Sequence, residues 1–345
     1  MGTRRRRVSV IYFISKLVKW DDLRMEIISN PTQDEIKKAA QALKDGHLVA
    51  FPTETVYGLG SDATNKKAVS RVYSVKGRPA DHPLIVHISS INQLGKWAID
   101  IPECAINLAE EFWPGPMTLI LKRAEIAKDF ITGGQESVGV RVPSHPVALE
   151  LLSEFEKLGG IGIAAPSANK FGAVSPTNSQ DVYQDIGSNL SLNDLILDGG
   201  SCAIGIESTI IDCTLRLPNI LRPGSITSEM IKNLTKISSQ SSNIKKIRVP
   251  GVFSSHYAPA SEVVISEKAL VGDGFLALAN IITPTGAIRL SAPTSLEEYA
   301  KELYVAFRSA DEKKLKRIVA VLPEGGGLAE AIRDRIIKAS GYSMK

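Results

Sequence analysis

The residues of this chain that could do chemistry are mostly hydroxyls, amides and cations that follow apolar runs. Phe51 ends one such run and is followed by Pro-Thr-Glu-Thr, and Ala165 ends another and is followed by Pro-Ser-Ala-Asn. Polar groups after strand ends are typical of the crevices in which α/β proteins bind ligands. The set comprises Thr53, Thr55, Lys76, Arg78, Arg141, Ser167, Asn169, Ser208 and Arg222.

This set suits the binding of a polyphosphate and a small zwitterion without a covalent nucleophile. Arginine offers a planar fork to phosphate or carboxylate, and lysine offers a point charge. Reactions of that kind depend on positioning and charge neutralisation, so phosphoryl or nucleotidyl transfer fits best, with Mg²⁺ carried by phosphate oxygens. The sequence has no P-loop, no nucleophile elbow and no HExxH pair, and its Gly-rich run at 199–205 does not open a helical pattern.

Three of these positions also have a purely structural interpretation. The stretch 52–60 is equally consistent with a tight turn that binds nothing. A lone Lys76-Gly-Arg78 is more often a solvated loop than an anion site, although two nearby prolines stiffen this one. Arg141 lies in the middle of an apolar strand pattern, where it makes either a structural ion pair or a ligand contact.

The hydrophobic pattern predicts alternating strands and helices over residues 25–235. Thr32 caps one helix and forms a capping box with Glu35, and Ser144 caps another that has Pro146 in its first turn. Strands are predicted at 26–29, 48–51, 84–88, 117–121, 137–142, 161–165, 195–197 and 206–213, and helices at 32–46, 65–75, 102–112, 144–159 and 226–234.

A second unit is predicted after a linker that spans 236–261 and contains a His-Tyr-Ala-Pro element. Within residues 262–345, three short apolar runs precede a helix for which Thr294 and Glu297 form a capping box. A strand at 318–322 and a helix at 328–340 follow. The expected fold class is therefore α/β, with a twisted open sheet and flanking helices joined by a linker to a smaller Rossmann-like parallel α/β domain.

The net charge of +4 is concentrated at the N-terminus. Residues 1–24 carry seven basic and two acidic side chains, a net of +5, so residues 25–345 carry −1. This distribution argues against a globally basic nucleic-acid-binding surface.

The Arg-rich start followed by a short apolar run resembles a secretory signal without a cleavage site or, more weakly, an organellar targeting peptide. We favour a third interpretation, in which Met25 is the true start and residues 1–24 are not part of the fold.

The cysteine pattern and the hydropathy predict the compartment. Cys104, Cys202 and Cys213 lie far apart, without CxxC spacing. This arrangement argues against a zinc site or a disulfide framework and fits a reducing compartment. No run of 18 apolar residues is present. We therefore expect a cytoplasmic protein that does not span a membrane and has no metal site of its own.

Eight motifs occur in order over residues 26–235. They are Phe51–Gly60, Lys76–Pro79, Pro83–His87, Trp113–Thr118, Val140–Pro143, Pro166–Asn169, Glu207–Ile210 and Leu221–Gly224. Together they resemble the YrdC-like family in its long, two-domain form, whose members make L-threonylcarbamoyl-AMP. The His-Tyr-Ala-Pro element and the C-terminal unit resemble the long form more loosely.

The resemblance implies a YrdC-like sheet and a reaction in which L-threonine, bicarbonate or CO₂, and ATP, with Mg²⁺ on its phosphates, give L-threonylcarbamoyl-AMP and pyrophosphate. It also implies a downstream tRNA threonylcarbamoyltransferase complex, which modifies the adenosine next to the anticodon, and weak binding of tRNA by this chain. By the same resemblance Lys76 and Arg78 are catalytic, and the threonine ligands are Thr55, His87, Arg141, Ala165 and Ser208. The implied ATP ligands are Arg78, His82, Ser137, Ser167, Ser175, Arg222 and Ser254, supported by Thr53, Asn169, His256 and Tyr257.

Two departures from the family pattern affect the nucleotide end of this expected site. His82 stands where the family usually has asparagine, so the charge at this position would vary near neutral pH. Phe253 and Ser254 replace a Lys-Tyr pair in the linker, and the tyrosine that would reach the nucleotide is missing. His256 and Tyr257 are kept, and we expect the linker to close over the nucleotide as a lid that excludes water.

Two other functions fit the same family. An RNA-binding module is one alternative, which the −1 charge of residues 25–345 and the lack of interleaved aromatic and basic residues disfavour. A carbamoyl-transfer protein of the hydrogenase-maturation type is the other. Those proteins carry acylphosphatase-like and zinc-finger segments, which this sequence lacks.

Overall fold

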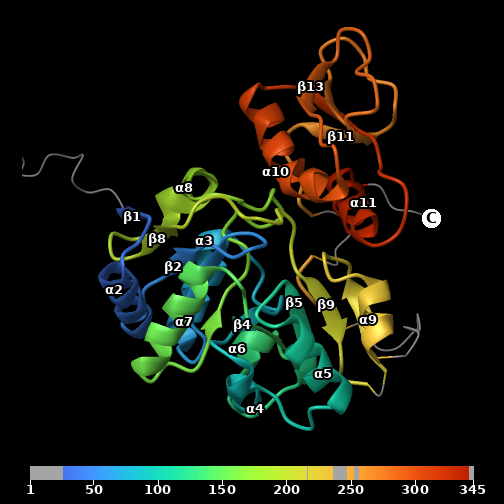
Figure 1. Ribbon diagram of the computed structural model, residues 1–345. Coiled ribbons are helices and arrows are strands. Elements are labelled where there is room, and N and C mark those ends of the chain that lie inside the picture. The colour runs from blue at the N-terminus through green and yellow to red at the C-terminus, as the bar shows by residue number, and fades with distance from the viewer. Residues whose placement is uncertain (1–25, 216, 236–246, 252–255, 342–345) are drawn as a thin grey trace, which may run out of the picture.

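The computed structural model describes residues 26–215, 217–235, 247–251 and 256–341. They form a large unit and a smaller C-terminal unit, which is orange to red in Figure 1. The large unit has the strands β1 (Glu26–Ser29), β2 (Val49–Phe51), β3 (Gly58–Asp62), β4 (Ile85–His87), β5 (Met117–Lys122), β6 (Ser137–Arg141), β7 (Ile163–Ala164), β8 (Leu195–Asp198), β9 (Thr209–Asp212) and β10 (Asn219–Arg222).

The helices of the large unit flank these strands. They are α2 (Gln33–Lys44), α3 (Lys66–Lys76), α4 (Leu94–Trp97), α5 (Glu103–Phe112), α6 (Asp129–Thr132), α7 (Pro146–Lys157), α8 (Ser179–Ile186) and α9 (Ser228–Thr235). The C-terminal unit contains β11 (Glu262–Ile265), β12 (Gly274–Leu276), β13 (Ile288–Ser291), α10 (Leu296–Glu312), β14 (Arg317–Ala320) and α11 (Leu328–Ala339).

The strands of the large unit form one mixed sheet in the order β1-β8-β2-β3-β7-β4-β6-β5-β9-β10. Those of the C-terminal unit form a parallel sheet in the order β11-β14-β12-β13. The predicted fold class is confirmed. The strand β10 and the helices α4, α6 and α8 were not predicted, and each of them is short.

The stretch after Phe51 forms a hairpin, and this corrects the expectation of a turn alone. Residues 58–62 form β3, which pairs antiparallel with β2 so that Gly60 lies opposite Val49. A Cβ atom on Gly60 would lie 2.7 Å from Ile163 Cγ2 and 2.8 Å from the Phe51 ring. Glycine is therefore needed here for close packing inside the sheet, and the sequence pattern does not distinguish this need from a turn.

One of the three predicted helix caps is confirmed and two are shifted by one residue. The capping box of Thr32 and Glu35 is present at the start of α2. His145 caps α7 in place of Ser144, because the His145 Nδ1 atom accepts a hydrogen bond from the Val147 N–H. At α10 the cap is Ser295, not Thr294, since a Ser/Thr-x-x-Glu pattern occurs in both registers and the structure uses the second.

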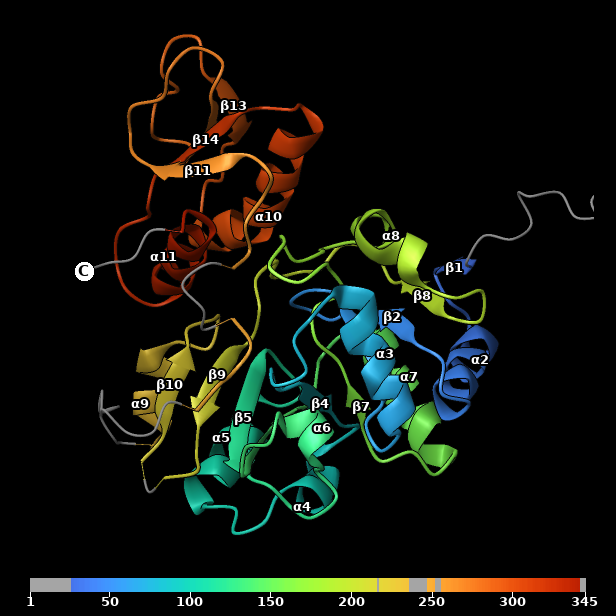
Figure 2. The same cartoon turned by 180° about the vertical axis from the view of Figure 1, so that it is seen from behind.

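The two units share part of their core. Val56, Val174 and Ile206 of the large unit are buried in the same apolar cluster as Leu303 and Tyr304 of α10. Figures 1 and 2 show that α10 and α11 lie between the small sheet and the large unit, and side chains of both helices belong to this cluster. The C-terminal unit is therefore packed on the large unit by apolar burial, which is the main stabilising contribution to such interfaces.

The backbones of the two units approach each other closely at Gly205. Its φ is +84°, and a Cβ atom on it would lie 2.5 Å from the Lys301 Cα atom in α10. The backbone of α10 cannot move away without breaking the shared apolar cluster. Gly200 has a similar φ of +86°, but a Cβ atom there would meet nothing within 4 Å.

Gly205→Ala should therefore destabilise the protein by roughly 3 kcal/mol or more, since it adds overpacking to left-handed strain. Gly200→Ala is the matched control and should cost only the strain, about 1–2 kcal/mol. Urea unfolding of the two variants beside the wild type measures the difference. Equal losses of stability would show that the units are not in tight contact at Gly205.

Candidate active site

A cavity lies where the β2–β3 hairpin, the ends of several central strands and the linker meet. The tips of β4, β6 and β7 supply part of its wall, and Ser208, next to β9, supplies another part. The predicted site residues that line it are Thr53, Thr55, Arg78, His87, Arg141, Ala165, Ser167, Ser208, Arg222, His256 and Tyr257. Segments separated by more than a hundred residues in the sequence thus meet in one place.

Arg141 lies at the end of β6 with its guanidinium at the cavity wall. Its Nη2 atom donates to Glu54 Oε1 at 2.7 Å and to Thr55 Oγ1 at 3.0 Å, and its Nε atom donates to Gly115 O at 3.3 Å. The second oxygen of Glu54 accepts from the Ser144 N–H at 3.0 Å. The structure therefore makes Arg141 both an ion-pair partner and a cavity residue, so the two interpretations of this residue hold together.

Glu54 is a functional candidate that the sequence analysis did not single out. Its side chain is buried and fixes the orientation of the Arg141 guanidinium. The signal was available, because Glu54 lies in the middle of the Pro-Thr-Glu-Thr stretch. Its partner, 87 residues away, was not visible from spacing.

Hydroxyl groups line the same end of the cavity. Thr53 Oγ1 lies 2.8 Å from Thr55 Oγ1 and also donates to Val56 O, which fixes the loop after β2. Ser208 Oγ lies 2.8 Å from Thr118 Oγ1, a neighbour on β5. A guanidinium and several fixed hydroxyls provide ligands for a small molecule with a carboxylate and a hydroxyl group.

Arg222 and Arg78 supply two further cations at the cavity. Arg222 donates from Nε and Nη2 to Ser208 O at 3.0 and 2.9 Å and from Nη1 to Pro250 O at 3.1 Å. Arg78 donates from Nη2 to Pro83 O at 3.0 Å, and its guanidinium lies 5.7 Å from the centre of the Phe171 ring. Burial lowers the pKa of Arg78 to about 10, which still leaves it charged at neutral pH.

Lys76 does not line the cavity. Its ammonium group is buried at the end of α3 and donates to the backbone carbonyls of Ser167 and Asn169 and, at 3.4 Å, to Asn169 Oδ1. Burial lowers the pKa of Lys76 well below its usual value, and the charge of Arg78 adds to this. Lys76 thus holds the loop after β7 in place, and its catalytic role remains a prediction.

The other predicted residues are not among those that line the cavity in the described part of the chain. Asn169 joins Lys76 and Ser167, with its Oδ1 atom accepting from Ser167 Oγ at 2.6 Å. Ser175 Oγ donates to Glu207 Oε1 at 2.6 Å. His82 and Ser137 lie outside the cavity lining; the His82 ring contacts Phe171, and Ser137 begins β6. Ser254 and Phe253 lie outside the described residues.

The cavity is cationic overall, with one carboxylate at its wall. Burial would raise the pKa of Glu207, but the charges of Arg335 and Arg222 outweigh this effect and hold the pKa at about 2. His87 and His256 are neutral, because burial lowers the pKa of each to about 3. Three arginines, two neutral imidazoles and one paired carboxylate suit an anionic ligand.

Neither a metal centre nor a membrane span is found among the residues that the structure describes. Among these residues, no three side chains of His, Cys, Asp or Glu gather in a way that could hold a metal ion. None of the described helices combines the length and the apolar content that a bilayer span requires.

The buried neutral histidines make stability depend on pH. In the unfolded chain His87 and His256 have a pKa near 6.5, whereas in the folded protein it is about 3. Their neutral form is thus favoured by folding: no stability is lost above pH 6.5, and stability falls as the pH drops from 6.5 towards 3. Within that window, each histidine should lower the free energy of unfolding by about 1.4 kcal/mol for each unit by which the pH falls.

Urea unfolding at a series of pH values measures this loss. His87→Asn should make the slope between pH 6.5 and 5 shallower by about 1.4 kcal/mol per pH unit. His47→Asn, outside the cavity lining, is the control. An unchanged slope in His87→Asn would mean that His87 is not buried as a neutral group.

Comparisons with known proteins agree with this geometry. A family model described as "Telomere recombination", which covers YrdC-like sequences, matches residues 41–224, and one described as "Threonylcarbamoyl-AMP synthase, C-terminal domain" matches residues 226–341. The threonylcarbamoyl-AMP synthase of Pyrococcus abyssi is 39% identical over 331 residues, which cover 90% of this chain and 95% of that protein. The Bacillus subtilis enzyme is 39% identical over 345 residues, covering 93% and 96%.

A solved structure gives the same result. The crystal structure of Pyrococcus abyssi Sua5 complexed with L-threonine matches with a TM-score of 0.82 and 37% identity, covering 92% of this chain and 98% of that one. The fold and the site therefore define an α/β enzyme of the YrdC-like class in its two-domain form. The chain belongs to the threonylcarbamoyl-AMP synthase family.

Proposed function

We propose that this chain makes L-threonylcarbamoyl-AMP and pyrophosphate from L-threonine, bicarbonate or CO₂, and ATP. The observation that carries the proposal is the convergence of Arg78, Arg141 and Arg222 with fixed hydroxyls on one cavity. Such a cavity can hold a carboxylate and a polyphosphate at the same time. The likeness to a threonine-bound structure supports threonine as the carboxylate ligand.

In the proposed reaction the threonine amine attacks CO₂, or bicarbonate with loss of water, and loses a proton to give a carbamate. A carbamate oxygen then attacks the α-phosphorus of ATP, and the bond to the β-phosphate oxygen breaks to release pyrophosphate. The protein contributes positioning and neutralisation of charge on the phosphates. We assign the threonine carboxylate to Arg141, which lies beside Thr55, and neutral His87 and Ser208 to the rest of the amino acid.

The phosphates of ATP are assigned to Arg78 and Arg222, which also line the cavity. Mg²⁺ enters with ATP and is held mainly by phosphate oxygens, since the described residues contain no set of metal ligands. Lys76 orders the loop that carries Ser167 and would act from behind the wall. His256 and Tyr257 line the cavity from the linker side and would exclude water from the adenylate, which is easily hydrolysed.

The product is an activated acyl donor, so a second enzyme must take the threonylcarbamoyl group from it. We propose that this acceptor is a tRNA threonylcarbamoyltransferase complex that modifies the adenosine next to the anticodon. Weak binding of tRNA to this chain would assist the transfer, although residues 25–345 carry a net charge of −1.

Pyrophosphate release tests the proposal, with L-threonine and bicarbonate added singly and together to the enzyme with Mg²⁺ and ATP. Release that needs both is the expected result. Release without threonine would indicate another amine substrate or simple ATP hydrolysis. No pyrophosphate release, together with a salt-sensitive shift of tRNA mobility in a gel, would favour an RNA-binding module. Turnover of carbamoyl phosphate would favour carbamoyl transfer.

A further inference from the structure

A carboxylate stands at the wall of the cavity where the substrate phosphates are proposed to bind. Glu207 directly precedes Ser208, is 6% exposed and lines the cavity. Its charge is unfavourable for a polyphosphate ligand unless a cation compensates it. Among the predicted site residues, Arg222 attracts this carboxylate but makes no described hydrogen bond to it, because its hydrogen bonds go to Ser208 and Pro250.

The cation that bonds directly to the Glu207 carboxylate comes from the C-terminal unit. Arg335, on α11, is fully buried and donates from Nε to Glu207 Oε2 at 2.8 Å and from Nη2 to Glu207 O at 3.3 Å. Tyr304, on α10, places its hydroxyl 3.0 and 3.2 Å from the two carboxylate oxygens. Ser175 is the one described hydrogen-bond partner that the large unit gives to this carboxylate, at 2.6 Å.

The Arg335 guanidinium also supports the linker wall of the cavity. It lies 5.4 Å from the centre of the Tyr257 ring, and that ring stacks on Tyr304 with centroids 5.9 Å apart. Without Arg335, the remaining cation that attracts the Glu207 carboxylate is Arg222. A Glu207–Arg222 ion pair would then withdraw Arg222 from the phosphates and leave Tyr257 without its cation contact.

We propose that Arg335 is a positioning residue for the nucleotide end of the site, which holds and neutralises Glu207 so that Arg222 stays available to ATP phosphates. This inference rests on the proposed function, since it assumes that ATP binds beside Arg222. It gives the C-terminal unit an electrostatic part in substrate binding that acts through a residue of the large unit.

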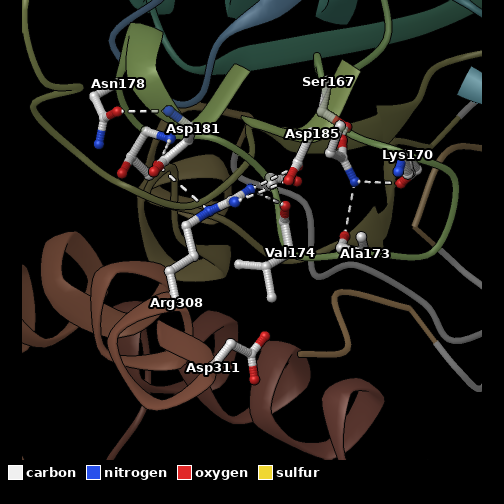
Figure 3. A network of polar contacts seen from close by, with 12 residues as sticks. Ser167, Lys170, Ala173, Val174, Asn178, Asp181, Asp185, Arg308 and Asp311 are labelled. Atoms are coloured by element: carbon white, nitrogen blue, oxygen red, sulfur yellow. Dashed lines mark hydrogen bonds and ion pairs between the residues drawn. The ribbon is translucent and has the colours of Figure 1, made fainter. Parts of the chain in front are cut away.

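A second ion pair between the units supplies the matched control. Arg308, on α10, donates to Asp185 at 2.9 and 3.1 Å and to Val174 O at 2.6 Å, and lies 3.4 Å from Asp181 (Figure 3). None of these partners lines the cavity. Removing Arg308 therefore weakens the contact between the units without leaving an unpaired carboxylate at the site.

Steady-state kinetics of Arg335→Met and Arg308→Met, with threonine and ATP varied separately, test the proposal. Arg335→Met should raise the KM for ATP about tenfold or more and change the KM for threonine less than about twofold. Arg335→Lys keeps the charge and should recover most of the loss. Arg308→Met should leave the KM for ATP near the wild-type value.

The double variant Glu207→Gln/Arg335→Met separates charge neutralisation from packing. Once the carboxylate is gone, loss of Arg335 should no longer matter, so this variant and Glu207→Gln alone should have the same KM for ATP within about twofold. Thermal unfolding shows whether Arg335→Met alone is folded. If it is not, the comparison of the double variant with Glu207→Gln still tests the proposal. A double variant that is much worse than Glu207→Gln, or an equal rise in Arg308→Met, would overturn the proposal.

Calorimetric titration of the wild type with Mg·ATP separates this inference from the proposed function. If the wild type binds ATP and Arg335→Met binds it equally well, the role of Arg335 is wrong and the proposed function stands. If the wild type binds no ATP, the proposed function fails, and the role assigned to Arg335 fails with it.

Discussion

Replacing Arg141 by methionine should reduce threonine-dependent pyrophosphate release on the order of a hundredfold to a thousandfold, because the substrate carboxylate loses its charged partner. The guanidinium lies at the cavity wall and is already oriented by Glu54 and Thr55. The affinity for threonine should fall, while the affinity for ATP measured by calorimetry should change less than about threefold, since the phosphates are assigned to other arginines.

Two control variants show whether the loss comes from ligand recognition. Arg141→Lys keeps a positive charge beside Glu54 but loses the planar fork, so an intermediate KM for threonine is expected. Arg123→Met removes an arginine that pairs with Asp129 and Glu136 on the surface, and it should leave turnover unchanged. Wild-type affinity for threonine in Arg141→Met would contradict the assignment of the carboxylate to Arg141.

Arg141→Met also leaves the Glu54 carboxylate buried without its partner. Removing one member of a buried ion pair costs about 3–5 kcal/mol, so this variant should unfold at lower urea concentration than the wild type. Kinetics must therefore be recorded at a temperature where the variant is folded. Glu54→Gln/Arg141→Met removes both charges, and it should recover stability without recovering threonine binding.

Removing residues 250–345 should lower the yield of product by about a hundredfold or more, because it displaces groups that fix the site. The truncation takes away Arg335 and Tyr304, which hold Glu207, and it takes His256 and Tyr257 from the cavity wall. It also uncovers apolar side chains of the large unit, among them Val56, Val174 and Ile206.

The control for this truncation is a protein that is cleaved between the two units but keeps both fragments. Cleavage at a protease site introduced within 236–246 breaks the covalent link, and the shared apolar cluster should keep the two fragments associated and active. Circular dichroism shows whether the truncated protein is folded. If the folded truncation gives an undiminished yield of product, the linker does not protect the adenylate from water.

Local features of the fold were predictable from the sequence because their causes lie within a few residues. The Thr32–Glu35 capping box is one example, since both partners lie in the same turn. The strand β3 was not predictable in this way. Gly58 and Gly60 indicate a turn by themselves, and only the Phe51 ring and Ile163, brought close by the sheet, show why glycine is needed.

The residues of the site could also be predicted only where their causes are local or come from a family resemblance. Resemblance to a family predicted most of the cavity-lining residues, from Thr53 to Tyr257, before the structure placed them together. The charge partners were not predictable, because Glu54–Arg141 and Glu207–Arg335 join residues 87 and 128 positions apart. A single sequence shows which residues are charged, and only tertiary structure shows which of them are paired.

Mass spectrometry of the reaction product tests most directly whether the convergent arginines build an adenylate of carboxylated threonine. The enzyme is incubated with L-threonine, Mg·ATP and ¹³C-labelled bicarbonate, and the quenched mixture is analysed at once. The predicted result is one species that contains threonine, the labelled carbon and AMP, formed together with pyrophosphate and absent from Arg141→Met. Pyrophosphate release with AMP alone, and no species carrying both threonine and the label, would contradict the proposed function.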